Sequence, residues 1–182
     1  VKSVPIILCA EAILFAYKAG LFNIGVAGQY TVGIIASIYC SLALGWSWPL
    51  CLLAAILAGA FWGFLSGCFK AFFNVNEVIA GIMLNWIGLC ICNIILGRPE
   101  CMNQSKSETY DLAANNPKAL LPGFMQEFFG NNKYISIAVP LTIIVAVIIL
   151  IVLNKTTLGY ELKATGHNKD AAKYAGMNAK IS

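Results

Sequence analysis

The sequence predicts an all-α integral membrane protein in which about five helices cross the bilayer. Hydrophobic residues make up 59% of the 182 positions, charged residues only 11%, and the mean hydropathy is +0.77. A soluble domain carries about 25% charged residues, so this chain has too few to cover a water-exposed surface. The composition therefore excludes a soluble globule, a disordered tail and a nucleic-acid-binding arm.

Five apolar segments divide the chain. Four uncharged runs are each long enough to cross a bilayer, which takes about 20 helical residues, and they cover 27–45, 49–69, 78–97 and 134–153. A fifth run, 3–17, is shorter and carries Glu11. Because the chain starts at Val1 and stops abruptly at Ser182, we expect a fragment, incomplete at both ends, that forms one transmembrane domain over 1–182.

The orientation follows from the positions of lysine and arginine in the connections. Five alternating spans place 18–26, 70–77 and the tail 154–182 on one side, with seven lysines against three acidic residues. The long connection 98–133 on the other side has four basic and four acidic residues. We therefore expect a multi-pass protein of the cell membrane with a cytoplasmic tail and an extracytoplasmic loop over 98–133.

The sequence contains no pattern typical of an enzyme. It has no phosphate-binding glycine loop, no H-E-x-x-H and no G-x-S-x-G. The lone His167 cannot build a catalytic triad or a metal site, and none of the seven cysteines forms a C-x-x-C pair. We therefore expect no catalytic residue, no metal and no cofactor on this chain, and a partner must supply any energy.

Three polar residues inside the apolar runs need a partner or a task, because polar groups are costly at membrane depth. Glu11 either lines an aqueous path, binds solute or pairs with a missing helix, or else lies near a wet boundary. Asn85 and Asn93 each either bond across helices or contact a polar solute, since an amide both donates and accepts.

The segment 18–29 interrupts the apolar sequence with three glycines, Asn23 and Gln29. Irregular backbone at membrane depth is tolerated only where protein buries it or water reaches it. A broken helix here would present backbone groups to a solute, as in many transporters; the alternative is a plain cytoplasmic turn. On the first interpretation, the candidate substrate-pathway residues are Asn23, Gly25, Gly28, Gln29, Asn85 and Glu11.

Glycines recur every four residues in the run 49–69, at Gly59, Gly63 and Gly67, preceded by Ala55. This spacing makes a groove that lets a neighbouring backbone approach closely. The groove belongs either to a moving bundle or to static packing.

The tail contains a pattern typical of a short helix over 168–175. Asn168 can cap it, Asp170 lies in its first turn, and Gly176 fits the left-handed position that ends a helix. Two helical turns are unstable alone in water, so the segment is either a docking element for another protein or a surface linker.

Three strings resemble signatures of nucleoside-type ABC importer permeases. They are K-A-G-L-F-N-I-G-x-x-G-Q at 18–29, K-A followed by N-E-V-I and I-M-L-N over 70–85, and G-Y-E-L-K-A-T-G-x-N-x-x-A-A-x-Y-A-G at 159–176. They occur in the order of that family, the branched-chain amino acid/ribose/nucleoside permeases, and resemble its basic-membrane-protein-associated branch. Glu11 has no counterpart in the resemblance.

The resemblance implies a permease of roughly ten helices, of which this chain is a central part. It implies a second permease subunit, two ABC ATPase subunits that bind ATP and Mg, and an extracytoplasmic solute-binding (lipo)protein as partners. The tail 154–182 would be the cytoplasmic coupling loop. The ATPase-coupling residues that it implies are Gly166, Asn168, Ala171, Ala172, Ala175 and Gly176.

Four functions are considered, in order of preference. The strings at 18–29 and 70–85 favour nucleoside import by alternating access, and a simple-sugar (ribose-type) ABC permease is the alternative. An ion-coupled secondary transporter with Glu11 as its ion site is less favoured, because such a carrier needs no ATPase-docking helix. A scaffold without transport activity is disfavoured by the buried amides and the broken segment.

Overall fold

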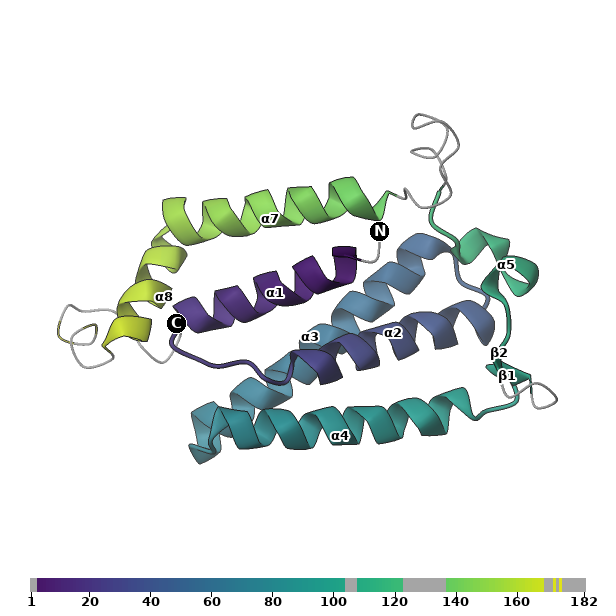
Figure 1. Cartoon of the computed structure of the whole chain (residues 1–182), viewed down its shortest axis with the longest axis horizontal. Coiled ribbons are helices and arrows are strands. Elements are labelled where there is room, and N and C mark those ends of the chain that lie inside the picture. The colour runs from purple at the N-terminus through teal and green to yellow at the C-terminus, as the bar shows by residue number, and fades with distance from the viewer. Residues whose placement is uncertain (1–2, 104–107, 123–136, 169–171, 173, 175–182) are drawn as a thin grey trace. The chain divides into compact units, whose positions relative to one another are not determined.

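The computed structural model describes residues 3–103, 108–122, 137–168, 172 and 174. It confirms the all-α class, with a helix in each predicted apolar run (Figure 1). These helices are α1 (Ser3–Lys18), α2 (Val26–Leu42), α3 (Trp48–Phe73), α4 (Glu77–Leu96) and α7 (Ala138–Lys155). Within the described part, α3, α4 and α7 are long and apolar enough to cross a membrane. Helix α2, with 17 residues, is a shorter apolar helix, and α1 has 16.

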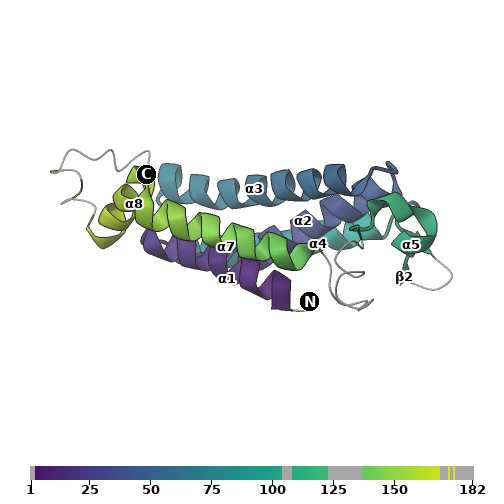
Figure 2. The ribbon, with the colours of Figure 1, turned by 90° about the horizontal axis from the view of Figure 1, so that it is seen from above.

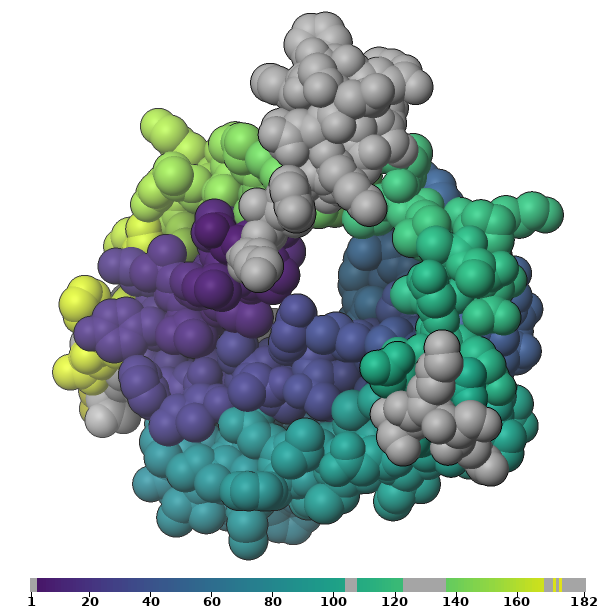
Figure 3. Space-filling model, turned by 45° about the vertical axis from the view of Figure 1, so that its right-hand side comes forward, coloured from purple at the N-terminus to yellow at the C-terminus, as the bar shows by residue number. Residues whose placement is uncertain are grey.

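The chain divides into two compact units. Unit 1 comprises Val1–Ile24 and Gly123–Ser182, and unit 2 comprises Gly25–Pro122. In unit 1, α1 packs along α7, and α8 (Thr157–His167) contacts both helices (Figure 2). In unit 2, α2 packs against α3 and α4, which also contact each other. The space-filling view shows the teal surface of α4 directly beside the blue surface of α2 (Figure 3). The expectation of a single domain over 1–182 stays a prediction.

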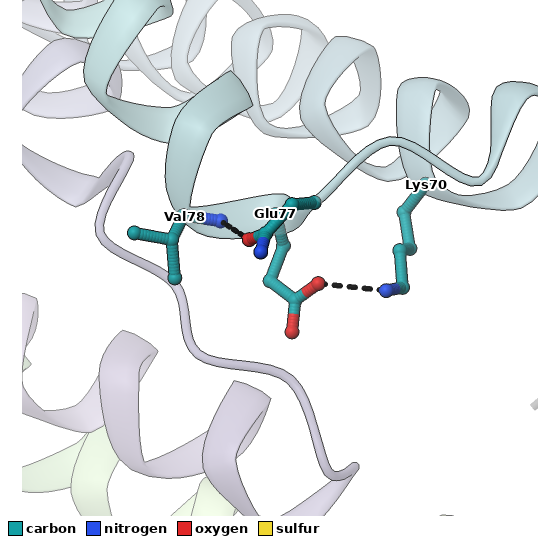
Figure 4. A network of polar contacts seen from close by, with 4 residues as sticks. Lys70, Glu77 and Val78 are labelled. Carbon is teal, nitrogen blue, oxygen red and sulfur yellow. Dashed lines mark hydrogen bonds and ion pairs between the residues drawn. The ribbon is translucent and has the colours of Figure 1, made fainter.

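The turn between α3 and α4 is determined by local polar chemistry. Asn74 ends α3 in the left-handed conformation, with φ 51°, which asparagine tolerates better than most residues. Asn76 then caps α4, because its side chain accepts a hydrogen bond of 2.9 Å from the backbone N–H of Val78. Lys70 forms an ion pair of 2.8 Å with Glu77 across the same turn (Figure 4).

The described part of the long connection packs against α2 and α3 within unit 2. It contains the antiparallel pair β1 (Met102–Asn103) and β2 (Glu108–Thr109), then α5 (Leu112–Asn115) and η1 (Pro117–Ala119). The amide nitrogen of Asn116 donates to the carbonyl oxygens of Ser41 at 3.0 Å and Trp46 at 2.9 Å. These two bonds tie the connection to the end of α2 and to the turn that follows it.

The tail differs from the sequence prediction in one respect. A helix, α8, precedes the predicted helix at 168–175. Asn168 is the extended C-cap residue of α8, and its carbonyl accepts a 3.0 Å bond from the N–H of Ala172, as a new helical turn would require. Ala171, Ala175 and Gly176 lie outside the described residues. Helix α8 was not predicted because the hydropathy of 157–167 is low, although Thr156 is an N-cap signal: its hydroxyl oxygen accepts a 3.2 Å hydrogen bond from the N–H of Gly159.

Candidate functional site

The start of α2 is capped by a side chain from another helix. Its own N-cap residue is Gly25, which has no side chain to satisfy the free N–H groups of the first turn. Asn85 of α4 supplies the missing acceptor, since its Oδ1 accepts a 2.7 Å hydrogen bond from the N–H of Gly28. Gly28 is the third residue of α2, and its N–H is one of the two donors that an N-cap side chain usually binds. Asn85 therefore bonds across helices, as one of its two interpretations predicted.

Gly28 must be small because three atoms crowd it. A Cβ atom at this position would lie 2.8 Å from Oδ1 of Asn85, and 3.1 Å from both Cα of Asn85 and Nε1 of Trp62. Contacts below 3.0 Å do not occur for real side chains without a shift of the neighbour. The glycine thus lets α2 approach α3 and α4 at the same point.

Trp62 completes this cluster, and the sequence analysis missed it. The side chain is 8% exposed, and its indole Nε1 is buried without a hydrogen-bond partner within the described part of the chain. A buried indole N–H normally has a partner, so this donor is unusual. The sequence did contain a signal for Trp62. Tryptophan in membrane helices is enriched at the interfaces, so a tryptophan in the middle of α3 is unusual.

Gln29 lies over the glycine groove of α3. A Cβ at Gly63 would lie 3.2 Å from the side-chain nitrogen Nε2 of Gln29. A Cβ at Gly59 would lie 3.4 Å from the backbone carbonyl oxygen of Gln29. In the same way, a Cβ at Gly33 would lie 3.2 Å from the carbonyl oxygen of Ala55. The predicted close approach is therefore confirmed for these residues. Gly67 differs, since no described atom lies within 4 Å of its built Cβ.

The cluster lies partway along α4 rather than at its end. Asn85 is eight residues after Glu77, where α4 begins, which corresponds to about 12 Å at 1.5 Å per residue. The whole helix of 20 residues is about 30 Å long, close to the thickness of a bilayer core. The non-helical segment before α2 therefore ends beside the middle of an apolar helix.

The structure gathers four of the six candidate pathway residues. Gly25, Gly28, Gln29 and Asn85 all lie at the start of α2 or against it. The other two belong to unit 1: Asn23 lies in the non-helical connection and Glu11 lies on α1. The Oε2 atom of Glu11 is buried, with no hydrogen-bond partner among the described residues.

The described coupling candidates lie at the end of α8. Gly166 is in its last turn, Asn168 follows it, and Ala172 is 4% exposed. A Cβ at Gly166 would lie 2.5 Å from the carbonyl oxygen of Lys18. Two of the signature strings, 18–29 and 159–176, thus meet in unit 1. Among the described residues no group of His, Cys, Asp and Glu is arranged to hold a metal ion.

Comparison with known proteins adds a family and named relatives. The family model described as the permease component of branched-chain amino acid transport systems matches residues 1–182. The chain is 37% identical over 180 residues to the guanosine ABC transporter permease protein NupP of Bacillus subtilis. It is 35% identical over 185 residues to the nucleoside ABC transporter permease protein NupB of Lactococcus lactis.

A relative with a different printed substrate also matches. The chain is 33% identical over 187 residues to the glucose ABC transporter permease protein TsgB13 of Haloferax volcanii. Each alignment covers at least 97% of this chain but only about half of the relative, 50%, 50% and 49% respectively. No solved structure matches the chain.

Proposed function

Because the chain belongs to the family of branched-chain amino acid transport system permease components, we propose that it is part of the membrane subunit of an ABC importer for nucleosides. The observation that carries the proposal is the similarity to two nucleoside permeases over at least 97% of the chain. Three apolar helices long enough to cross a membrane agree with a multi-pass subunit.

In this proposal the chain does no chemistry of its own. Two partner ATPase subunits bind and hydrolyse ATP with Mg, a second permease subunit completes the path, and an extracytoplasmic binding protein delivers the solute. The tail 154–182 faces the cytoplasm and docks to an ATPase, and the loop over 98–133 faces outward. The net positive charge of the connections on the tail side supports this orientation.

The cluster at the start of α2 forms part of the solute path. The free N–H groups of a helix start carry a partial positive charge and favour electronegative atoms of a solute. The amides of Gln29 and Asn85 donate and accept hydrogen bonds, as the hydroxyls and base edges of a nucleoside require. The position of the cluster beside the middle of α4 supports a path at membrane depth, since many transporters bind solute at a broken helix near the midplane.

The path is tested with substitutions in the full-length permease assembled with its ATPase and binding protein. Asn85→Ala and Gln29→Ala should raise the KM for nucleoside uptake or lower its maximal rate by roughly tenfold, which is the loss of about one good hydrogen bond. Asn93→Ala is the matched control, because Asn93 is exposed on the same helix. Unchanged KM and rate in both variants would move the path elsewhere.

The substrate class is tested by uptake of labelled guanosine, labelled uridine and labelled ribose or glucose in the same cells. We expect uptake of the nucleosides that is lost when the ATPase is inactivated. ATPase-dependent uptake of the sugars alone would favour the sugar permease, which the similarity to the glucose permease supports. Uptake that does not depend on the ATPase would exclude an ABC importer.

A further inference from the structure

The last turn of α1 ends in a motif that requires a glycine. Gly20 has φ +77°, the left-handed conformation that L side chains rarely adopt. The N–H of Leu21 donates to the carbonyl of Ala16, and the N–H of Gly20 donates to the carbonyl of Tyr17, both at 3.0 Å. This pair of bonds is the Schellman motif. It stops α1 and begins the non-helical connection to α2.

The end of α8 packs backbone to backbone on this turn. A Cβ at Gly166 would lie 2.5 Å from the carbonyl oxygen of Lys18 and 2.9 Å from the nitrogen of Gly20. A Cβ at Gly20 would lie 2.9 Å from Cα of Gly166. The contact is reciprocal, and it exists only because both residues are glycines.

The start of α8 is held in the same way against α7. A Cβ at Gly159 would lie 2.6 Å from both Cα and the carbonyl oxygen of Leu153, and it would overlap the carbonyl oxygen of Val152. Backbone atoms cannot move aside by changing a rotamer, so α8 is clamped at both ends. A displacement of α8 toward α1 must therefore push the last turn of α1.

The contact lies between two segments that matter for transport. Gly166 is two residues before Asn168, where the chain leaves α8 for the segment that resembles the coupling helix. Gly20 is six residues before Val26, where α2 begins. We propose that the contact between Gly20 and Gly166 transmits motion of α8 to the connection 19–25 ahead of α2. Both glycines are thus positioning residues for coupling, and this inference rests on the proposed function.

The first test measures the coupling ratio, the amount of nucleoside imported per ATP hydrolysed, in proteoliposomes that contain the complete transporter. Gly166→Ala isolates the contact, because Gly166 lies in a helix without a positive φ. Gly67→Ala is the matched control, a helical glycine whose Cβ would meet no described atom within 4 Å. We expect Gly166→Ala to retain its ATPase subunits and lower the ratio at least fivefold, while Gly67→Ala leaves the ratio unchanged.

Combining Gly166→Ala with Gly20→Ala distinguishes a shared contact from two separate defects. Both substitutions separate the same two backbones, so their effects on the coupling ratio should fall well short of additive. Normal coupling in Gly166→Ala, or loss of ATPase binding as its only defect, would overturn the inference.

A measurement on the unaltered transporter covers the case in which the variants do not fold. Hydrogen exchange is compared with and without a non-hydrolysable ATP analogue. Exchange should change together in the peptides covering 160–168 and 15–22. A change at 160–168 alone would show that the contact transmits nothing. If the unaltered transporter needs no ATPase for uptake, the proposed function itself fails, and that outcome is visible before any variant is made.

Discussion

Within each of the two units, the elements are held together by a different kind of contact. In unit 1, backbones meet directly at glycines, as Gly20 meets Gly166 and Gly159 meets Leu153. In unit 2, backbones approach glycines less closely, since a Cβ at Gly33 would lie 3.2 Å from the carbonyl oxygen of Ala55. Polar side chains also bridge the elements there, as Asn85 caps the start of α2 and Asn116 bonds near its end. The side chains of unit 2 can swing away from a neighbour, whereas the backbones of unit 1 cannot.

This difference indicates a division of labour under the proposed function. Backbone contacts are suited to transmit force, since they fix a distance without an adjustable group. Bridging side chains can exchange one partner for another, so a path lined by them can rearrange as solute passes. Four substitutions, ordered from the largest expected effect to the smallest, test whether the two units respond as this contrast requires.

Gly159→Ala should cause the largest loss. The new methyl group would meet the backbone of α7, with Leu153 Cα at 2.6 Å, so relief requires a shift of a helix. We expect a destabilisation of about 3 kcal/mol, the upper part of the usual range for overpacking. Thermal unfolding of the purified permease measures it, with Gly67→Ala as the control. Equal stability of the two variants would show that α8 is not clamped against α7.

Gly28→Ala should cost less, although its surroundings are also crowded. The atom nearest to a new Cβ is Oδ1 of Asn85 at 2.8 Å, and Nε1 of Trp62 is one of two further atoms at 3.1 Å. Because two of these three atoms belong to side chains that can turn, we expect about 1–2 kcal/mol in the same unfolding assay. A loss as large as that of Gly159→Ala would remove the contrast between the units.

Asn116→Ala should have a smaller and more local effect. It removes the donor to two carbonyl groups, of Ser41 and Trp46, and each lost bond is worth about 1 kcal/mol or less if water replaces it. Proteolysis within the long connection should become several times faster while the stability of the helices hardly changes. Unaltered proteolysis, relative to the exposed control Asn93→Ala, would show that Asn116 does not tie the connection down.

The smallest effect concerns the pH dependence of unit 2. Burial raises the pKa of the Cys101 thiol, the neighbouring Glu100 raises it further, and Arg98 partly opposes them. Between the pKa of this thiol in the unfolded chain and its higher pKa in the folded one, the folded protein keeps a proton that the unfolded chain has released. Its stabilising contribution is therefore complete below that window and is lost as the pH rises through it.

Stability curves of the original protein and of Cys101→Ala, recorded between roughly pH 7 and 10, measure this contribution. The curve of the original protein should fall slightly more steeply with pH. Alkylation of Cys101, which is 0% exposed, should also be slower than in the detergent-unfolded chain. Parallel stability curves for the original protein and Cys101→Ala would contradict the raised pKa of the Cys101 thiol.

Much of the fold was predictable because helix formation and hydropathy are local properties. The apolar runs and the glycine groove of α3 were both visible in short windows, and the structure contains each of them. The three signature strings led to the family in the same way. The segment 18–29 was recognisable as an interruption, although its two interpretations could not be separated by sequence.

The pairings that make up the sites were decided by tertiary structure. Gly28 meets Asn85 from 57 residues away, and Gly20 meets Gly166 from the other end of the chain. Helices α3, α4 and α7 are apolar on all sides, so hydrophobic periodicity could not indicate which face would lie inside. The indole of Trp62, which has no hydrogen-bond partner among the described residues, and the bonds of Asn116 likewise depend on packing between elements. The sequence by itself determined where the apolar helices form and which family the chain belongs to. The packing of the helices decided which polar groups and glycines meet, because those contacts join residues that no local window contains.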